Sequence, residues 1–394
     1  MSGIRKEDIR AALARRRQEG NFRSCSCVQR RSGAHIWVDG REYINFSSND
    51  YLGMAASAVL EEAWRRGLEI WGAGSGASPL VTGMSDIHRE LAAWIADFLD
   101  MEAVLLFSSG FAANQAVIKT FCGSDTVFYM DRLAHASLQD AAMHSKGRLL
   151  RFTHNSPESL ERYMRKYGPG LVVTEGVFSM DGDQPPLAEI LEVAERYGSD
   201  VMLDDAHGFG VLGEQGRGTV NAQNLTHDRF AIVTGTFGKA YGTGGAFVAT
   251  SAENAAYMEN FAREYIYSTF MPPAQAYATL RSMQYVAEEP FMRELVGHHV
   301  QSFRRQLKDT SFTLLPSEVS IQPLIVGESE KALELSEFLK TRGFWASAIR
   351  PPTVPKGTAR IRFTLTAGHK YVEIDALCMT LIEWDLCHKA ERRS

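Results

Sequence analysis

The sequence predicts an α/β protein: a mainly parallel, doubly wound sheet with an N-terminal segment and a smaller C-terminal α+β domain. From about residue 55 to 290, short unbroken apolar runs alternate with helical patterns such as 86–99 and 187–197. Strands buried on both faces read as continuous apolar runs, and helices between them imply crossovers between parallel strands. The expected strands cover residues 103–107, 126–130, 148–152, 171–175, 201–205, 231–235 and 245–250.

The N-terminal segment predicts a helix followed by a hairpin. Residues 4–18 carry Ile4, Ile9 and Leu13 on one side and arginines elsewhere, which is typical of an amphipathic helix. Residues 35–46 alternate apolar and polar side chains around Asp39-Gly40, a strong two-residue turn signal. The stretch SSNDYLGM that follows predicts an ordered loop, in which Tyr51 is interpreted as a packing residue.

The last hundred residues predict a second, smaller α+β domain. A helical pattern runs from residue 290 to about 308, and another covers 329–342. Strand patterns cover 320–327 and 359–366, and a closing helix covers 371–387. We therefore expect three parts, which are residues 1–54, 55–290 and 291–394.

Composition excludes several classes of protein. The chain has 394 residues, 45% hydrophobic and 23% charged, with a net charge of -5, so no general basic excess is available to neutralise nucleic-acid phosphates. Five scattered cysteines form no zinc-binding or disulfide pattern and predict free thiols in a reducing compartment. No apolar run reaches membrane-spanning length and no signal peptide is recognisable, so we expect a cytoplasmic protein without nucleic-acid or membrane partners.

Ionisable side chains follow three of the predicted strands. Glu175 ends one strand, Asp204 and His207 end the next, and Lys239 follows a third. In open α/β sheets, ligands bind at the carboxyl ends of the strands. An isolated Asp in such a place is usually a helix cap and an isolated Lys a surface residue, but four groups at neighbouring strand ends indicate one site.

These residue types match what pyridoxal phosphate (PLP) requires. A lysine must hold the aldehyde, and Lys239 lies among glycines that allow close approach. The pyridine nitrogen needs a carboxylate partner, for which Asp204 is placed, and His207 can reach the neighbouring ring oxygen. A strand-to-helix turn at residues 108–114, with the Thr236 hydroxyl, can bind phosphate. His135 is a candidate for stacking on the ring.

Two other classes of protein, dinucleotide-binding dehydrogenases and PLP-binding regulators, fit the sequence less well. GAGSGA at residues 72–77 fits the dinucleotide-binding fingerprint, but it follows a helical pattern rather than a strand, which disfavours a dehydrogenase. A PLP-binding regulator without turnover would carry a DNA-binding module, and we expect none in these 394 residues.

Longer motifs then carry a specific resemblance. They are SNDYLG (48–53), SSGFAANQA (108–116), DRLAHASL (131–138), TEGVFSMDGD (174–183), DDAHGFGVLGEQGRG (204–218), TFGKAYG (236–242), YSTFMPPAQA (267–276) and IRPPTVPKGTARIRFTLTA (349–367). Together they resemble the α-oxoamine synthases, a family of fold-type I PLP enzymes, almost from end to end of the chain.

The resemblance implies roles around the cofactor. Lys239 would form the Schiff base, His135 would stack on the ring, Asp204 would pair with the pyridine nitrogen and His207 would bind the ring hydroxyl. Ser179 would lie beside the ring. The implied phosphate ligands are Gly110, Phe111, Thr236 and, from the neighbouring subunit, Thr269. The last of these implies a homodimer with its active site at the subunit interface.

The resemblance also implies a substrate end of the site. Arg362 matches the arginine that pairs with the amino-acid carboxylate, although Arg360 shares its face of the strand, and the choice between them stays open. Asn49, Arg23 and Arg350 match further positions at the substrate end. Arg23 could equally be a surface charge.

The implied reaction is a decarboxylative condensation of an amino acid with an acyl thioester. Ser78 favours L-alanine over glycine, and the likeness is strongest to members that use a pimeloyl thioester in biotin synthesis. Members that use glycine, such as glycine C-acetyltransferase and 5-aminolevulinate synthase, are the alternative. Pro79 departs from the family pattern near the acyl channel, which leaves open whether the acyl group is carried by CoA or by an acyl carrier protein.

Overall fold

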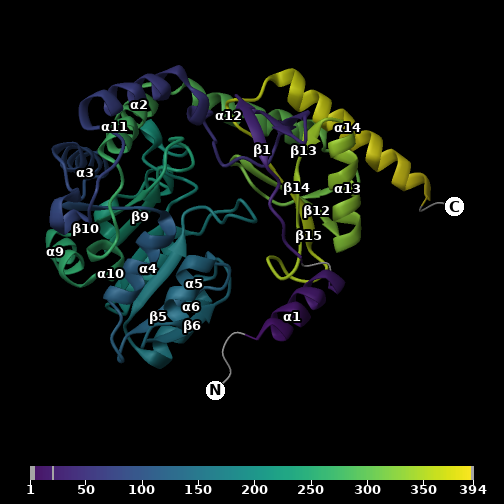
Figure 1. Ribbon diagram of the computed structural model, residues 1–394. Helices are drawn as coiled ribbons and strands as arrows, with labels where there is room; N and C mark the ends of the chain where they lie inside the picture. The colour runs from purple at the N-terminus through teal and green to yellow at the C-terminus, as the bar shows by residue number, and fades with distance from the viewer. Residues whose placement is uncertain (1–4, 20–21, 392–394) are drawn as a thin grey trace.

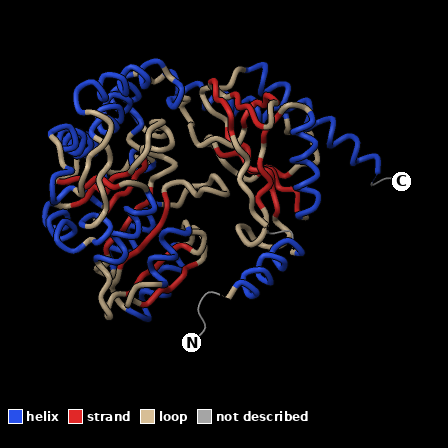
Figure 2. The backbone as a smooth tube through the Cα atoms, viewed as in Figure 1, coloured by secondary structure: helices blue, strands red, loops and turns tan. Residues whose placement is uncertain are grey.

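The computed structural model describes residues 5–19 and 22–391 (Figure 1). Figure 2 shows a large body, in which helices flank a central sheet, beside a smaller body with its own strands and helices. The N-terminal helix lies below the smaller body in this view. The domain boundaries at residues 54 and 290 stay predictions. The N-terminal segment and the C-terminal part share a sheet.

The large body is organised around a seven-stranded sheet with the order β4-β10-β9-β8-β7-β5-β6. Its strands are β4 (Ala103–Phe107), β5 (Val127–Asp131), β6 (Arg148–Phe152), β7 (Leu171–Glu175), β8 (Asp200–Asp204), β9 (Ile232–Thr236) and β10 (Ala246–Thr250). All pairs are parallel except those of β10, which runs antiparallel to β4 and β9. The mainly parallel sheet predicted from the apolar runs is confirmed, with strand bounds that agree to within one residue.

Helices cover both faces of this sheet. Along β5, Phe128 and Met130 belong to one apolar cluster and Tyr129 to another, as expected when successive side chains point to opposite, covered faces. The helices are α2 (Ala58–Trp71), α3 (Asp86–Leu99), α4 (Gly110–Thr120), α5 (Ala136–Met143), α6 (Pro157–Tyr167), α7 (Leu187–Arg196), α8 (Thr219–Ala222), α9 (Ala252–Phe261), α10 (Arg263–Ile266) and α11 (Pro273–Glu288). Short turns occur at η1 (Met54–Ala56), η2 (Pro79–Gly83), η3 (Glu214–Gly216) and η4 (His227–Arg229).

Close packing of α2 on α11 explains a glycine in the middle of a helix. A Cβ atom added at Gly67 would lie 2.9 Å from both Cα and the carbonyl oxygen of Ala274, so only glycine allows this approach. Helix α2 ends before Gly72, and the GAGSGA stretch therefore follows a helix, which agrees with the rejection of the dinucleotide-binding interpretation.

The N-terminal segment has the predicted helix and hairpin. Helix α1 (Lys6–Gln18) is followed by β1 (Val28–Ser32), β2 (His35–Val38) and β3 (Arg41–Asn45), with Asp39 and Gly40 both at positive φ in the turn. The apolar side of α1 is not buried in this chain, since Ile9 and Leu13 are 47% and 42% exposed. Ile4, which was expected on the same side, lies outside the described residues.

The C-terminal part forms a second sheet with the order β11-β12-β15-β14. Its elements are α12 (Phe291–Gln306), β11 (Thr313–Leu314), β12 (Ile321–Gly327), α13 (Ser329–Thr341), β13 (Phe344–Trp345), β14 (Ser347–Ile349), β15 (Ala359–Thr364) and α14 (Tyr371–Glu391). Strand β13 joins the N-terminal sheet by pairing with β3. One apolar cluster includes Tyr51, Phe209 and Phe363, so a continuous core connects the two bodies.

Two expectations, free cysteines and no membrane-spanning segment, can be compared with the described part of the chain. All five cysteines are free thiols, as predicted. Between residues 5 and 391, apart from the undescribed positions 20 and 21, we find no helix with the length and apolar character needed to cross a membrane.

Candidate active site

A pocket of about 180 Å³ lies at the carboxyl edge of the large sheet. Glu175, Asp204 and Thr236 are the last residues of three adjacent strands, and Lys239 follows the third. The residues that line the pocket are Gly110, Phe111, Asn114, His135, Ser137, Glu175, Asp204, Ala206, His207, Thr236 and Lys239. Side chains predicted from separate motifs therefore meet in one place, because parallel strands end at the same edge of the sheet.

Lys239 carries an amine with an unusual pKa. Its Nζ atom lies 2.8 Å from Nε2 of His207. Burial lowers the pKa of Lys239 from 10.5 to about 8, although the carboxylates of Asp204 and Glu175 oppose this shift. A substantial fraction of the amine is therefore neutral, and hence nucleophilic, near physiological pH.

His207 lies between Lys239 and Tyr51, and Tyr51 has a role beyond packing. Its Nδ1 atom lies 2.5 Å from the hydroxyl of Tyr51, while burial and the neighbouring Lys239 hold the pKa of His207 well below its usual value. Tyr51 was interpreted as a packing residue. Its ring is indeed buried, but its hydroxyl belongs to the site, so that interpretation is incomplete.

Asp204 is held in a defined orientation at the end of β8. Its Oδ2 atom accepts a hydrogen bond of 2.7 Å from the side-chain amide of Asn114, and its Oδ1 atom accepts one of 3.0 Å from the backbone of Ala206. Asn114 in turn accepts from the hydroxyl of Thr234 at 3.1 Å. Asn114 stands in the SSGFAANQA motif, but we predicted no role for it, because its orientation depends on how α4 packs on the sheet.

Glu175 and His135 face the same pocket from neighbouring elements. The carboxylate of Glu175 accepts a short hydrogen bond from the backbone N–H of His135, the residue that precedes α5. Burial and then the charge of Asp204 raise the pKa of Glu175 well above its usual value. The ring of His135 is exposed, lines the pocket, and bonds through Nδ1 to the hydroxyl of Ser137 at 2.8 Å.

The two candidate arginines on β15 have different surroundings. Arg360 forms a short ion pair with Asp181. Arg362 donates from Nε to the carbonyl of Ser179 at 2.6 Å and from its terminal nitrogens to the side-chain oxygen of Asn49 at 3.3 and 3.4 Å. Within the described ranges, no carboxylate forms a salt bridge with Arg362.

Seven predicted residues do not line the pocket around Lys239: the three just described (Asn49, Ser179 and Arg362), and Thr269, Ser78, Arg23 and Arg350. Thr269 is exposed, and Ser78 precedes η2, where its carbonyl accepts from the backbone of Gly83 at 2.9 Å. Arg23 and Arg350 line a separate hollow of about 350 Å³ near α1. Roles for these residues stay predictions.

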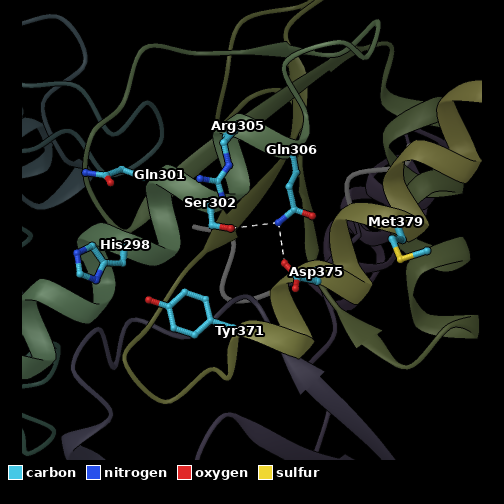
Figure 3. Close-up of a pocket in the computed structure, with 8 residues that line it drawn as sticks. All are labelled: His298, Gln301, Ser302, Arg305, Gln306, Tyr371, Asp375 and Met379. Atoms are coloured by element: carbon cyan, nitrogen blue, oxygen red, sulfur yellow. Dashed lines mark hydrogen bonds between the residues drawn. The ribbon is translucent and has the colours of Figure 1, made fainter.

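A larger hollow of about 680 Å³ lies between α12 and α14 (Figure 3). It is lined by His298, Gln301, Ser302, Arg305, Gln306, Tyr371, Asp375 and Met379. Gln306 bridges the two helices by donating to Asp375 at 2.7 Å. The hollow includes none of the predicted site residues, so size alone does not identify the active site.

The residues of the smaller pocket fit PLP. Lys239 supplies the amine and Asp204 an oriented carboxylate. Helix α4 begins at Gly110, and the first N–H groups of a helix have no partner within it, so they can bind a phosphate. A Cβ atom added at Gly110 would lie 3.7 Å from Cβ of Thr236 and would fill the space between the helix start and that hydroxyl-bearing side chain.

Fold and site together define a fold-type I PLP-dependent enzyme. The sequence profile described as aminotransferase class I and II matches residues 41–381. The 8-amino-7-oxononanoate synthase of Aeromonas hydrophila subsp. hydrophila is 48% identical, with 95% of this chain and 94% of that protein covered. The chain therefore belongs to the class I and II aminotransferase family and, within it, to the 8-amino-7-oxononanoate synthases, a group of PLP-dependent acyltransferases.

Solved structures agree with this assignment. A serine palmitoyltransferase of S. paucimobilis, solved with bound PLP and myriocin, has a TM-score of 0.89 and 27% identity, with 95% of this chain and 96% of that chain covered. An 8-amino-7-oxononanoate synthase of Francisella tularensis has a TM-score of 0.78 and 26% identity, with 88% of this chain and 99% of that chain covered. The predicted α-oxoamine synthase resemblance, fold type and cofactor are confirmed.

Proposed function

We propose that this protein joins L-alanine to a pimeloyl thioester, with loss of carbon dioxide, to give 8-amino-7-oxononanoate for biotin synthesis. The observation that carries the proposal is a partly buried lysine amine that shares one pocket with an oriented carboxylate, while the nearby Arg362 forms no salt bridge within the described residues. The names of the 43–48% identical relatives narrow the substrate class. The acyl carrier, CoA or acyl carrier protein, is left to experiment.

Each residue of the pocket has a task that its chemistry supports. When bound, PLP supplies an aldehyde that condenses with amines and a ring that accepts electrons from the neighbouring carbon. Asp204 provides the negative charge that keeps a pyridine nitrogen protonated. Gly110, Phe111 and Thr236 would bind the phosphate, and His207, together with Ser179, would lie beside the ring.

Lys239 is proposed to transfer protons, and His135 is proposed to polarise the thioester carbonyl. As a neutral amine, Lys239 Nζ can accept the α-proton of alanine and later return a proton to the product. Because His135 Nδ1 bonds to Ser137, its Nε2 is the ring nitrogen left to polarise the thioester carbonyl. Polarisation favours attack by the α-carbon, which breaks the C–S bond and releases the thiol of the acyl carrier, and the resulting β-keto acid then loses carbon dioxide.

Arg362 is the better candidate for binding the amino-acid carboxylate. Arg360 is already neutralised by Asp181, whereas Arg362 donates its hydrogen bonds to neutral oxygens. The positive charge of Arg362 also helps to lower the pKa values of His207 and Lys239, which places it near the pocket. A guanidinium can hold a carboxylate through two parallel hydrogen bonds.

Product analysis tests the proposal directly. The PLP-loaded protein would be incubated with alanine or glycine, each combined with pimeloyl-CoA or pimeloyl-acyl carrier protein, and the products identified by mass spectrometry. We expect 8-amino-7-oxononanoate from alanine, with at least one carrier. Faster turnover of glycine than of alanine would contradict the assignment, and the comparison between carriers decides the acyl donor.

We also propose a homodimer, because apolar side chains gather around the outer wall of the pocket. Helix α10 packs against both α4 and η2. Around this junction, Val81 is 73% exposed, Tyr267 70% and Phe111, which lines the pocket, 51%. Apolar surface of this kind is typical of a subunit interface. Thr269 lies two residues beyond Tyr267, where it could reach into the site of a partner subunit.

We also propose that the protein is located in the cytosol, because its cysteines are free thiols.

Substitution of the exposed apolar residues tests the dimer. Val81→Asp combined with Tyr267→Asp should convert a dimer of 43.8-kDa chains into monomers and weaken PLP binding, because a buried charge opposes association. Analytical ultracentrifugation and PLP titration measure the two effects. Val372→Asp, at a position 67% exposed on α14, is the control and should change neither. A wild-type monomer that binds PLP tightly would contradict the proposal.

The pKa of Lys239 predicts how the protein without cofactor captures PLP. Only the neutral amine reacts, so the rate should rise through about pH 8 and level off above pH 9, rather than rise toward 10.5. Stopped-flow absorbance measures the rate, with N-acetyl-lysine as the reference for any titration of PLP itself. A midpoint near pH 10.5 in the protein would show that burial does not lower the pKa of Lys239.

A further inference from the structure

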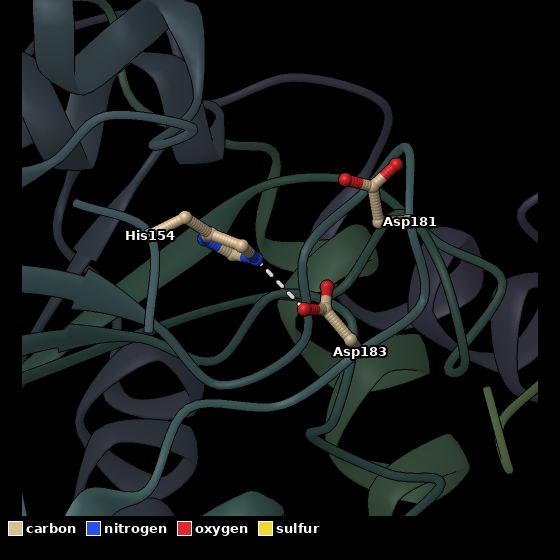
Figure 4. Close-up of side chains that lie close together, drawn as sticks. All are labelled: His154, Asp181 and Asp183. Atoms are coloured by element: carbon tan, nitrogen blue, oxygen red, sulfur yellow. Dashed lines mark hydrogen bonds and ion pairs between the residues drawn. The ribbon is translucent and has the colours of Figure 1, made fainter. Parts of the chain in front are cut away.

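The side chains of His154, Asp181 and Asp183 lie close together (Figure 4). Their ligand atoms lie within 4.8 Å of one another, which raises the possibility of a metal site. The imidazole is already engaged on both sides, by Asp131 at Nδ1 (2.9 Å) and by Asp183 at Nε2 (2.7 Å). Asp181 pairs with Arg360. A metal would have to displace all of these partners, so the cluster is a charge network instead.

The network holds one end of the loop between β7 and α7 on the large body. His154 follows β6, Asp131 ends β5, and Asp183 belongs to the loop. The side-chain amide of Asn155 also donates to Asp183 at 2.9 Å, and the edge of the His154 ring contacts Phe178 with 4.4 Å between ring centroids. Within the loop, the backbone N–H of Phe178 donates to the carbonyl of Asp183 at 3.0 Å.

The other side of the same loop contacts the C-terminal sheet. Arg360 donates to the carbonyl of Met180 at 3.3 Å, besides its ion pair with Asp181. Arg362 donates from Nε to the carbonyl of Ser179. A Cβ atom added at Gly182 would lie 2.6 Å from the carbonyl of Ile321 on β12, so the loop lies tightly against that sheet. The orientation of Arg362 therefore depends on where the loop is held.

We propose that His154 is a positioning residue for substrate binding. Its ion pairs anchor the Phe178–Asp183 turn on the large body, and the Ser179 carbonyl of that turn aligns the guanidinium of Arg362. The inference rests on the proposed role of Arg362 in binding the amino-acid carboxylate. His154 itself lines neither the cofactor pocket nor any other part of the proposed site.

The charge state of His154 gives this role a pH signature. Burial alone would lower its pKa, but the hydrogen bonds and charges of Asp131 and Asp183 raise the pKa of His154 from 6.5 to about 9. The other acidic group that faces it is Asp181, whose charge is shared with Arg360. The ion pairs are thus complete below about pH 6.5 and are lost as the pH rises through 9.

Propionate is a suitable probe, because it carries the carboxylate of alanine without an amino group that titrates near pH 9. Its inhibition constant against alanine would be measured with the PLP-loaded protein from pH 7 to 10. We expect His154→Gln to raise this constant about tenfold at pH 7.5, within the range for residues that act through others. In the wild type the constant should rise above pH 9, and that rise should disappear in His154→Gln.

Further variants separate positioning from general stability. In an Arg362→Lys background, His154→Gln should have little additional effect, since the aligned group is gone. Asp183→Asn provides a second perturbation of the same contact if His154→Gln folds poorly. His144→Gln is the matched control, because His144 is an exposed histidine that also pairs with an aspartate, Asp140, but lies on the surface end of α5.

The outcomes are distinct. If His154→Gln lowers the melting temperature but leaves the propionate constant and its pH profile unchanged, the inference is overturned and His154 is structural only. If Arg362→Lys itself leaves propionate binding unchanged, the proposed role of Arg362 fails first. An additive effect of His154→Gln in the Arg362→Lys background would likewise overturn the inference.

Discussion

Replacement of Lys239 by alanine is expected to lower kcat by about 10⁴-fold or more, because the amine is proposed both to hold the cofactor aldehyde and to move the α-proton. The geometry supports this double task. Nζ lies 2.8 Å from His207 Nε2 at the rim of the pocket, and burial brings the pKa of Lys239 to about 8, where one amine can both take and give a proton.

Steady-state kinetics and borohydride reduction test this expectation together. Reduction of the wild type with PLP should add a covalent mass at Lys239, and Lys239→Ala should show no such addition. The fold should persist, since Lys239 is only partly buried and forms no salt bridge within the described residues. Lys308→Ala, at an exposed lysine, is the control and should match the wild type. Substantial turnover by Lys239→Ala would exclude the lysine from the chemistry.

Replacement of Asp204 by asparagine is expected to lower kcat by about 10³-fold. The neutral amide keeps the shape of the side chain but can keep only one of the hydrogen bonds to Asn114 and Ala206, and it removes the charge that would keep the pyridine nitrogen protonated. Asp205 is the natural comparison, because it is the adjacent residue and is also buried.

Asp205→Asn should weaken the fold but leave kcat nearly unchanged. Asp205 accepts hydrogen bonds from the backbone of Thr219 at 2.7 Å and from its hydroxyl at 2.6 Å, away from the cofactor pocket. An amide cannot accept both with the same geometry, so we expect a loss of about 1–3 kcal/mol in the free energy of unfolding and a nearly normal kcat. Chemical denaturation and kinetics measure the two effects. Equal losses of kcat in the two variants would contradict the separate tasks.

Some parts of the fold could be predicted because their signal is local. The strands ending at Glu175 and Asp204 are unbroken apolar runs, and such runs have few alternatives to a strand buried on both faces. The hairpin at Asp39-Gly40 depends on two residues that tolerate positive φ. The exposure of the apolar side of α1 could not be predicted, since it depends on whether another element packs against Ile9 and Leu13.

The two neighbouring aspartates and the two arginines of β15 show where the sequence becomes ambiguous. Asp204 and Asp205 are the same residue type at the same strand end, and Arg360 and Arg362 lie on the same face of one strand. Only the packing of the strands against distant loops gives each a different partner, Asn114 or Thr219 in one case, and Asp181 or Ser179 in the other.

The sequence by itself therefore determined the class of sheet, the cofactor and most of the residues that line the pocket around Lys239, because apolar periodicity and the order of chemical groups along the chain are local properties. Only the tertiary structure decided that the hydroxyl of Tyr51 belongs to the site, that Glu175 holds the backbone of His135, and that His154 anchors the loop beside Arg362. These contacts join residues far apart in the chain, and their geometry depends on how distant segments pack against one another.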